Sequence, residues 1–206
     1  MTVMARIGAL TVASTARGER RRATLVDAAA AILLVKGLEG VSHRAVAEKA
    51  RVPLGATTYY FSTLDDLRRA AADRIVGREL VRMERAVAQV RPRRRGSRGT
   101  AAAVVDLLTP GSRSDVVAWY ERYVRSAREP LLREGARATN EAACRHVATV
   151  LERSGWNGAV PAHVALALVD GSVVGALVEG AAIARVRAAA RDALMVLLNL
   201  SVGAVR

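Results

Sequence analysis

Cysteine, histidine and aromatic residues are scarce in this chain of 206 residues. It contains one cysteine, Cys144, and three histidines, and aromatic residues make up 3% of the sequence. A single thiol excludes a disulfide framework within the chain and a cysteine-based metal site, and the scattered histidines lack metal-ligand spacing. We therefore expect a cytoplasmic protein with no bound metal and no other cofactor.

Long uninterrupted apolar runs are also missing, although hydrophobic residues make up 51% of the chain and the mean hydropathy is +0.16. The most apolar stretch, residues 164–183, is interrupted by Asp170 and Glu179, which makes it a poor membrane span. Residues 1–14 have too short an apolar segment for a good signal peptide. The composition predicts a packed globular protein that does not enter a membrane.

Strand patterns and catalytic motifs are absent as well. Apolar residues recur at helical spacing, and no β-branched run alternates between hairpin turns. We predict an all-α protein of about nine helices. After three N-terminal helices, the others are placed at 64–90, 100–109, 114–128, 130–154, 161–184 and 187–203. The chain has no nucleophile elbow, phosphate-binding glycine loop, HExxH motif or paired-carboxylate motif, so an enzyme is the least supported class.

Acidic residues are few in the first half of the chain. Residues 1–98 carry 20 lysines and arginines against 9 acidic residues, whereas residues 99–206 carry 12 against 10. The N-terminal half is therefore suited to a polyanion such as DNA. The excess of arginine and alanine is also typical of a GC-rich genome, such as an actinobacterial one. Part of the arginine content therefore carries no functional information.

The stretch SHRAVAEKARVPLGATTYYF, residues 42–61, has the pattern of a helix-turn-helix. Ser42 is a good N-cap, and Val46, Ala47 and Ala50 form one apolar stripe at helical spacing. Residues 51–53 break the pattern with a proline, after which a second, shorter helix can begin. A short helix of this kind, rich in hydroxyl groups and small residues, fits a DNA major groove.

Helices are predicted on both sides of this stretch. One runs from Glu19 to Lys36 and ends at Gly37, and another begins at Leu64 with two aspartates in its first turn. Residues 1–18 are expected to form a flexible basic arm, which could contact a minor groove or remain a solvated tail. The arginine-rich residues 91–99 are expected to form an exposed, mobile loop, with contact to DNA as the alternative.

Several of these residues together resemble the TetR family of transcriptional regulators, over about residues 19–67. The matching positions are Ser42, Val46-Ala47, Ala50-Arg51-Val52-Pro53, Gly55, Thr58-Tyr59-Tyr60-Phe61 and Asp65-Asp66-Leu67. The chain departs from the family pattern at Arg51, which replaces the turn glycine, and at Pro53, which replaces a capping serine. It also departs at Thr57, Thr58 and Leu64. We expect Arg51 to adopt a left-handed conformation at a cost of about 1 kcal/mol.

The resemblance implies a DNA-binding domain at residues 19–66 and an effector-binding and dimerisation domain at residues 67–206. It further implies a homodimer that binds a palindromic, double-stranded DNA operator and is released by a small-molecule effector, as a repressor is. The alternative is a sequence-nonspecific architectural DNA-binding protein.

Candidate site residues follow from the pattern and the resemblance together. Predicted DNA contacts are Ser42, His43, Arg44, Arg51, Pro53, Leu54, Gly55, Thr57, Thr58, Tyr59 and Tyr60. Capping alone for Ser42, and solvation alone for His43 and Arg44, are the simpler alternatives. The predicted effector pocket contains Trp119, Tyr120, Tyr123 and His146, where ordinary core packing is the alternative. Small residues in 161–184 and the apolar run LMVLLNL predict a dimer interface. Its residues are Val164, Leu168, Gly171, Gly175, Val178, Leu194, Leu197 and Leu198.

Overall fold

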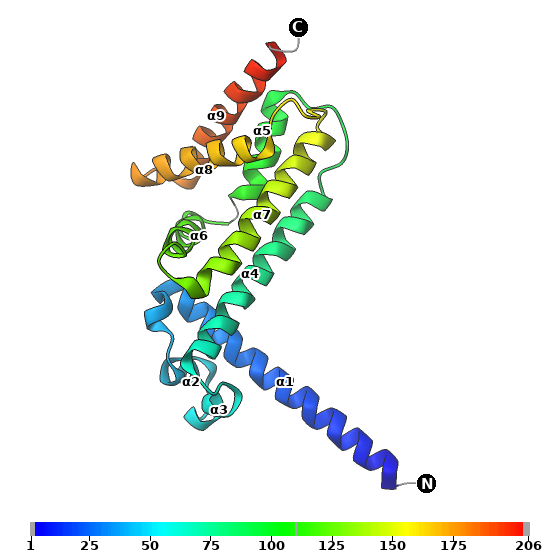
Figure 1. Ribbon diagram of the computed structural model, residues 1–206, viewed down its shortest axis with the longest axis vertical. Coiled ribbons are helices and arrows are strands. Elements are labelled where there is room, and N and C mark those ends of the chain that lie inside the picture. Colours follow the sequence, from blue (N-terminus) through cyan, green and yellow to red (C-terminus); the bar gives the residue numbers. More distant parts are fainter. Residues whose placement is uncertain (1–2, 110, 204–206) are drawn as a thin grey trace. The chain divides into compact units, whose positions relative to one another are not determined.

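The computed structural model describes residues 3–109 and 111–203 (Figure 1). Within these ranges the chain forms nine α-helices and one short 3-10 helix, without a strand, which confirms the all-α prediction. The chain divides into two compact units, and the boundary lies between Ile75 and Val76. This boundary falls inside one helix, α4 (Leu64–Ala88), which also contains the predicted boundary at residues 66 and 67.

The first unit contains α1 (Val3–Lys36), the 3-10 helix η1 (Leu38–Gly40), α2 (His43–Ala50), α3 (Leu54–Tyr60) and the first part of α4. Its core is built from apolar residues that every one of these helices except α3 contributes, and Phe61 after α3 completes it. The most deeply buried are Leu25, Ala29, Ala30, Val41, Val46, Leu67 and Ala71. Gly37 ends α1 with φ of 72°, a left-handed conformation that glycine adopts without strain.

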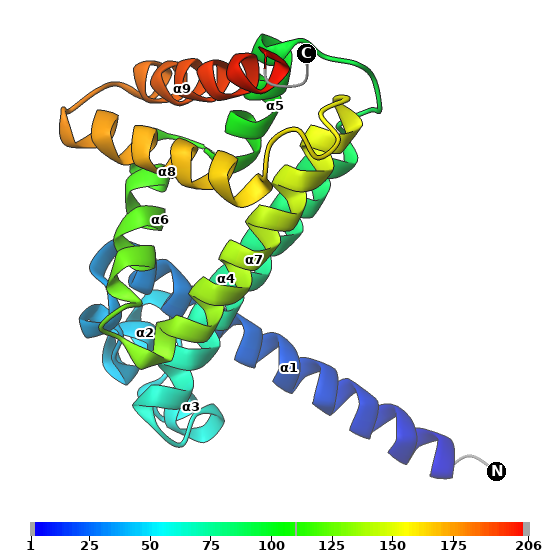
Figure 2. The same cartoon turned by 45° about the horizontal axis from the view of Figure 1, so that its top comes forward.

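Helix α1 begins much earlier than expected. Residues 3–18, which we predicted as a flexible arm, continue this helix. Its N-terminal part extends away from α2 and α3 in both ribbon views (Figures 1 and 2). The sequence lacks an apolar stripe there, which is evidence against a packed face but not against a helix. Alanine-rich sequence without proline can be helical through intrinsic propensity alone. Residues 1 and 2 of the predicted arm lie outside the described residues.

The second unit contains the rest of α4 together with α5 (Ser97–Leu108), α6 (Arg113–Arg125), α7 (Pro130–Arg153), α8 (Ala162–Val178) and α9 (Ile183–Gly203). Helix α7 lies beside the second half of α4, and α9 packs against both α5 and α8 (Figure 2). Buried residues of all six helices share one core. The predicted helices match these to within a few residues, except that α8 ends before Glu179 and Gly180 instead of continuing to residue 184. Gly180 turns the chain with φ of 76°.

The arginine-rich segment between α4 and α5 is exposed, as predicted, but its backbone is held in place. The Arg93 amide donates to the Arg153 carbonyl at 2.8 Å, and the Arg95 amide donates to the Ser154 carbonyl at 3.0 Å. The Trp156 indole N–H donates to the Arg95 carbonyl at 3.2 Å and to the Thr100 hydroxyl at 2.9 Å. Helix α5 begins inside the predicted loop, at Ser97. The prediction of a mobile loop therefore overlooked its contacts with the end of α7.

None of the helices in the described ranges is both long and apolar enough to cross a membrane.

Candidate DNA-binding and effector-binding sites

Ser42 caps α2 and fixes the start of the helix-turn-helix. Its hydroxyl accepts a hydrogen bond from the Ala45 amide at 3.2 Å, which satisfies one of the free N–H groups of the first turn. Arg44 in this turn is exposed. His43 is half-buried, and its Nδ1 has no hydrogen-bond partner within the described part of the chain. Capping by Ser42 is confirmed, whereas a contact of these residues with DNA stays a prediction.

Arg51 forms the turn in the conformation expected from the glycine that it replaces. Its φ of 55° and ψ of 49° are left-handed, and it is the one non-glycine residue with positive φ in the described ranges. The Arg51 amide donates to the Glu48 carbonyl at 3.1 Å, and the Val52 amide donates to the Ala47 carbonyl at 3.0 Å. These two bonds form a Schellman motif, which closes the end of α2. The Arg51 side chain is exposed.

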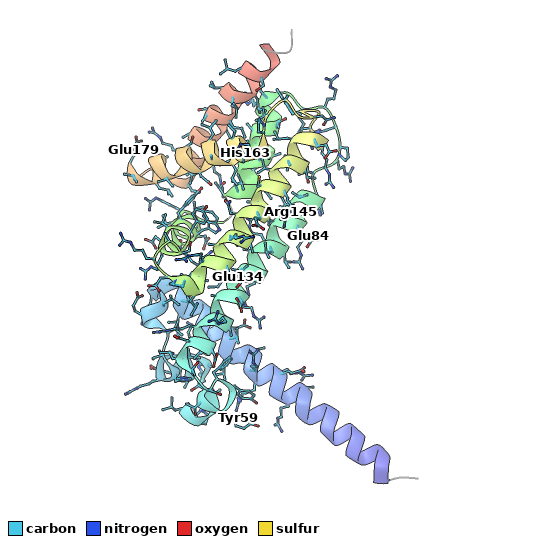
Figure 3. All side chains as sticks on the ribbon, viewed as in Figure 1. Tyr59, Glu84, Glu134, Arg145, His163 and Glu179 are labelled. Carbon is cyan, nitrogen blue, oxygen red and sulfur yellow. The ribbon has the colours of Figure 1, made fainter. Side chains whose placement is uncertain are left out.

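Helix α3 begins after Pro53, whose φ of −58° suits a helix start although it offers no side-chain cap. Leu54, Gly55, Thr58 and Tyr59 are exposed, and Tyr59 has 81% of its surface accessible. Figure 3 shows Tyr59 on the outer side of α3.

Gly55 leaves open space on this surface. A Cβ added at Gly55 would meet no atom within 4 Å, so packing within the chain does not require glycine at this position. The exposed face of α3 is therefore open to a close approach from outside.

Thr57 was predicted to contact DNA, and the structure contradicts this prediction. Its side chain is fully buried, and its hydroxyl donates to the Leu54 carbonyl at 2.8 Å. This internal hydrogen bond lets a hydroxyl residue occupy the buried side of α3, so the Thr57 side chain cannot reach DNA. Tyr60 is half-buried and packs edge-to-face with Tyr59, with ring centroids 5.0 Å apart. Phe61 is buried in the core, and the Arg22 guanidinium of α1 lies 5.0 Å from its ring centroid.

The three clustered aromatic residues of α6 are in mutual contact. The rings of Trp119 and Tyr123 are nearly parallel, with an interplanar angle of 9° and centroids 5.1 Å apart. Tyr120 meets Trp119 edge-on at 4.7 Å and is 92% buried (8% exposed). Trp119 and Tyr123 remain partly exposed. The pair offers an aromatic surface that core packing does not fully cover.

Two polar residues that were not predicted from the sequence join this cluster from neighbouring helices. The Tyr120 hydroxyl donates to Asp170 Oδ1 of α8 at 2.7 Å, and the Tyr123 hydroxyl donates to Asn140 Oδ1 of α7 at 3.4 Å. Burial raises the pKa of Asp170 above its usual value and raises that of Tyr120 far above its own. The signal for Asp170 was a carboxylate within the most apolar stretch of the chain.

Arg122 borders the same cluster on the side of α4. Burial lowers the pKa of its guanidinium, while the nearby Glu79 of α4 raises it. Glu79 also forms a two-point ion pair with Arg82, with distances of 3.1 and 2.7 Å. The inner face of α6 is thus bounded by residues of α4, α7 and α8.

No hydrogen bond or ring contact of the aromatic cluster in the described ranges includes His146. Burial and the adjacent Arg145 lower the pKa of His146, and Glu84 of α4 raises it. Figure 3 labels Arg145, which precedes His146 on α7, and Glu84 on α4. The structure therefore gives no support to His146 as an effector-binding residue.

Helix α8 presents an apolar stripe to the surface. Val164, Gly171, Gly175 and Val178 are exposed, with 82% of Val178 accessible, and Leu168 is partly exposed. A Cβ added at either glycine would meet nothing within 4 Å. These predicted interface residues are thus free to face another molecule.

Two predicted interface residues on α9 require correction. Leu194 and Leu198 are completely buried in the core of their own unit, so their side chains cannot contact a second subunit. Leu197 is partly exposed, and the accessible apolar residues nearby are Val196 and Leu200. Because LMVLLNL is apolar on almost every side of the helix, periodicity could not show which side is inward.

Comparisons with known proteins assign the chain to a family. A sequence profile described as "Tetracyclin repressor-like, C-terminal domain" matches residues 95–200. The multidrug binding protein EbrR, in its complex with proflavin, is 32% identical, with a TM-score of 0.61, over 86% of this chain and 99% of that one. The chain belongs to the TetR family.

Two further TetR-type relatives agree with this assignment. The family member SCO1917 from Streptomyces coelicolor A3 is 33% identical, with a TM-score of 0.61, over 86% of this chain and 98% of that one. The HTH-type transcriptional regulator PksA of Bacillus subtilis (strain 168) is 43% identical over 49 residues, which is 24% of each chain. As a TetR-family protein, the chain is a DNA-binding transcriptional regulator with a helix-turn-helix.

Proposed function

We propose that this TetR-family regulator binds a palindromic operator as a homodimer and represses transcription until a small-molecule effector releases it. The observation that carries the proposal is the exposed surface of α2 and α3, where a capped helix, a left-handed arginine and an exposed tyrosine lie close together in sequence. A cytoplasmic location remains a prediction that accords with this function.

The DNA-contacting residues follow from exposure on this surface. We assign base and backbone contacts in the major groove to Thr58 and Tyr59, with Leu54 and Gly55 allowing close approach. Arg44 and Arg51 are assigned to phosphates, because an exposed guanidinium at each end of α2 can pair with the DNA backbone. Ser42 would present the N-terminus of its helix to a phosphate, since such termini favour anions. His43, Pro53 and Tyr60 are further proposed contacts, and of these three Pro53 is exposed while His43 and Tyr60 are half-buried.

The dimer would use the apolar stripe of α8 together with the exposed residues of α9. Glycine within a helix costs about 1 kcal/mol relative to alanine, and close packing of a second helix on Gly171 and Gly175 would offset this cost. Covering Val178 would remove a large apolar side chain from water. A two-fold dimer would place its α3 helices about 34 Å apart, in successive major grooves of a palindrome.

Effector binding is assigned to the aromatic cluster of α6. EbrR, which is similar to this chain over most of its length, has been solved in complexes with proflavin, ethidium and malachite green. The partly exposed pair Trp119 and Tyr123 can stack with a ligand of this aromatic kind. An effector that binds one dimer conformation more tightly would shift the population away from the operator-binding form.

The proposal is tested by measuring the affinity of the protein for two DNA segments. One lies upstream of its own gene, and the other lies upstream of the adjacent operon. The reference is random DNA of equal length at the same salt concentration, because phosphate contacts make affinity strongly dependent on salt. We expect a specificity ratio of at least about 10³. A ratio near one would reject the regulator and favour the architectural DNA-binding protein.

A further inference from the structure

Asp170 is a desolvated carboxylate without a cationic partner. It lies on α8 among apolar neighbours, and its hydrogen bond is to the neutral hydroxyl of Tyr120, at 2.7 Å. No arginine, lysine or histidine of the described ranges forms an ion pair with it. Burial raises its pKa because the ionised form has lost water without gaining a positive charge. A cation placed near this carboxylate would remove the cause of the shift.

The half-buried guanidinium of Arg122, on the same helix as Tyr120, does not supply that charge. Arg122 lies on the opposite flank of the aromatic pair from Tyr120, since α6 turns by about 100° per residue. Its electrostatic partner is Glu79 of α4, which also pairs with Arg82. Glu79 on the α4 side is thus the acidic partner of both guanidiniums, and Asp170 on the α8 side has neither of them as a partner.

The carboxylate of Asp170 is connected to the aromatic pair Trp119 and Tyr123 through Tyr120. Tyr120 links the two, because its hydroxyl contacts Asp170 while its ring packs edge-on against Trp119, which stacks on Tyr123. The Tyr123 hydroxyl is in turn positioned by Asn140. Trp119, Tyr123 and Asp170 are each partly exposed, so ligand atoms can reach them while the helices stay in place.

We propose that Trp119, Tyr120, Tyr123 and Asp170 form a receptor for aromatic organic cations, in which a flat ring stacks on the Trp119–Tyr123 pair and Asp170 neutralises the positive charge. This proposal deepens the effector-binding part of the proposed function and rests on it. The class comprises fused-ring heterocycles with a quaternary or protonated nitrogen. Ring faces of tryptophan and tyrosine attract such cations electrostatically, and the carboxylate adds a full opposite charge.

The selectivity of the receptor follows from the same groups. A neutral ring of equal size would gain the stacking but would leave Asp170 unpaired. An anionic ring would meet the carboxylate at close range and be repelled. The charge of the ligand, rather than its ring alone, therefore decides affinity.

Isothermal titration calorimetry with two matched probes tests whether the charge of the ligand decides its affinity. N-methylacridinium carries a fixed positive charge, and acridine has the same fused rings and is neutral in a mildly basic buffer. We expect the wild-type protein to bind N-methylacridinium at least about tenfold more tightly, the factor that one contact to a charged group supplies. The Asp170→Asn variant should lose this preference while it keeps its affinity for acridine to within about twofold.

A control variant is available on the same helix. Glu121→Gln removes one negative charge from the exposed face of α6, next to Tyr120 in the sequence, and should bind both probes like wild type. The inference is overturned if Asp170→Asn keeps the preference for the cation, if it weakens both probes equally, or if wild type fails to prefer N-methylacridinium. Operator affinity without probe, measured on the same three proteins, separates the two proposals. A wild-type protein that binds its operator but does not prefer N-methylacridinium overturns only the receptor, whereas a wild-type protein without operator specificity overturns the proposed function.

Discussion

Arg51→Gly separates the two effects of the residue in the helix-turn-helix turn, which are backbone strain and DNA contact. A left-handed conformation costs a residue with a side chain about 1–2 kcal/mol, and glycine avoids that cost. Glycine also makes the unfolded chain more flexible, which costs about 0.4–1 kcal/mol. The difference predicts a variant that is more stable by about 0.5–1 kcal/mol, because the Schellman hydrogen bonds use only backbone atoms.

The same substitution should weaken DNA binding. The exposed guanidinium of Arg51 is assigned to one phosphate, and each such contact contributes about 0.9 to the slope of log affinity against log salt. Arg51→Gly should therefore raise the melting temperature by about 1–3 °C and reduce the magnitude of the salt slope by about one. Differential scanning fluorimetry and fluorescence anisotropy on labelled operator measure the two quantities.

Two matched variants assign each effect to its cause. Arg51→Lys keeps the charge and the strained backbone, so its stability and salt slope should stay near wild type. Arg98→Ala removes an exposed arginine from the other unit and should leave the salt slope unchanged. An Arg51→Gly protein that melts at or below the wild-type temperature refutes the strain argument. An unchanged salt slope refutes the phosphate contact.

The remaining predictions concern the recognition surface, the dimer and Asp170. Tyr59→Ala or Arg44→Ala should each weaken operator binding by about 1–3 kcal/mol and leave the circular dichroism spectrum unchanged, because both side chains are exposed. Gly175→Leu should fold but sediment as a monomer in analytical ultracentrifugation, since an added Cβ there meets nothing within its own chain. Asp170→Asn should be more stable than wild type at neutral pH. Burial raises the folded-state pKa of Asp170 above 3.8, so the free energy of unfolding of wild type falls as the pH rises from 3.8 through that pKa. The stability difference should shrink as the pH approaches 3.8 in thermal melts.

A different result would contradict each of these predictions. Wild-type operator affinity in both α2–α3 variants would mean that another surface meets the DNA. A dimeric Gly175→Leu protein would place the subunit interface elsewhere than on α8. An Asp170→Asn protein with the same stability as wild type at every pH would show that the carboxylate is well solvated in the folded state.

The helix-turn-helix could be predicted residue by residue because its determinants are local. The cap at Ser42 and the left-handed Arg51 both depend on backbone geometry within a few residues, and both were predicted from the sequence. Thr57 was assigned to the wrong side of α3 because a hydroxyl residue usually suggests exposure. Its hydroxyl is instead satisfied within the helix, which removes the penalty of burial.

Long-range packing explains most of what the sequence did not predict. The contact between Tyr120 and Asp170 joins residues 50 positions apart, and nothing local at either residue indicates the other. Leu194 and Leu198 were assigned to the dimer interface because their helix is apolar nearly all round, and only the packing against the rest of the core shows which side faces inward. The extension of α1 was missed for the opposite reason, since it is a helix without a packed stripe.

The contacts of the arginine-rich segment with the end of α7 bear on its cleavage by trypsin-like proteases. Such enzymes cut after arginine, and residues 91–98 contain five of them. A protease must draw its substrate into an extended form, but the amides of Arg93 and Arg95 are already bonded to α7, and Trp156 holds the Arg95 carbonyl. Cutting here therefore requires local opening, and its rate follows the stability of these contacts more than the number of arginines. Digestion at this segment would report on the Trp156 contact.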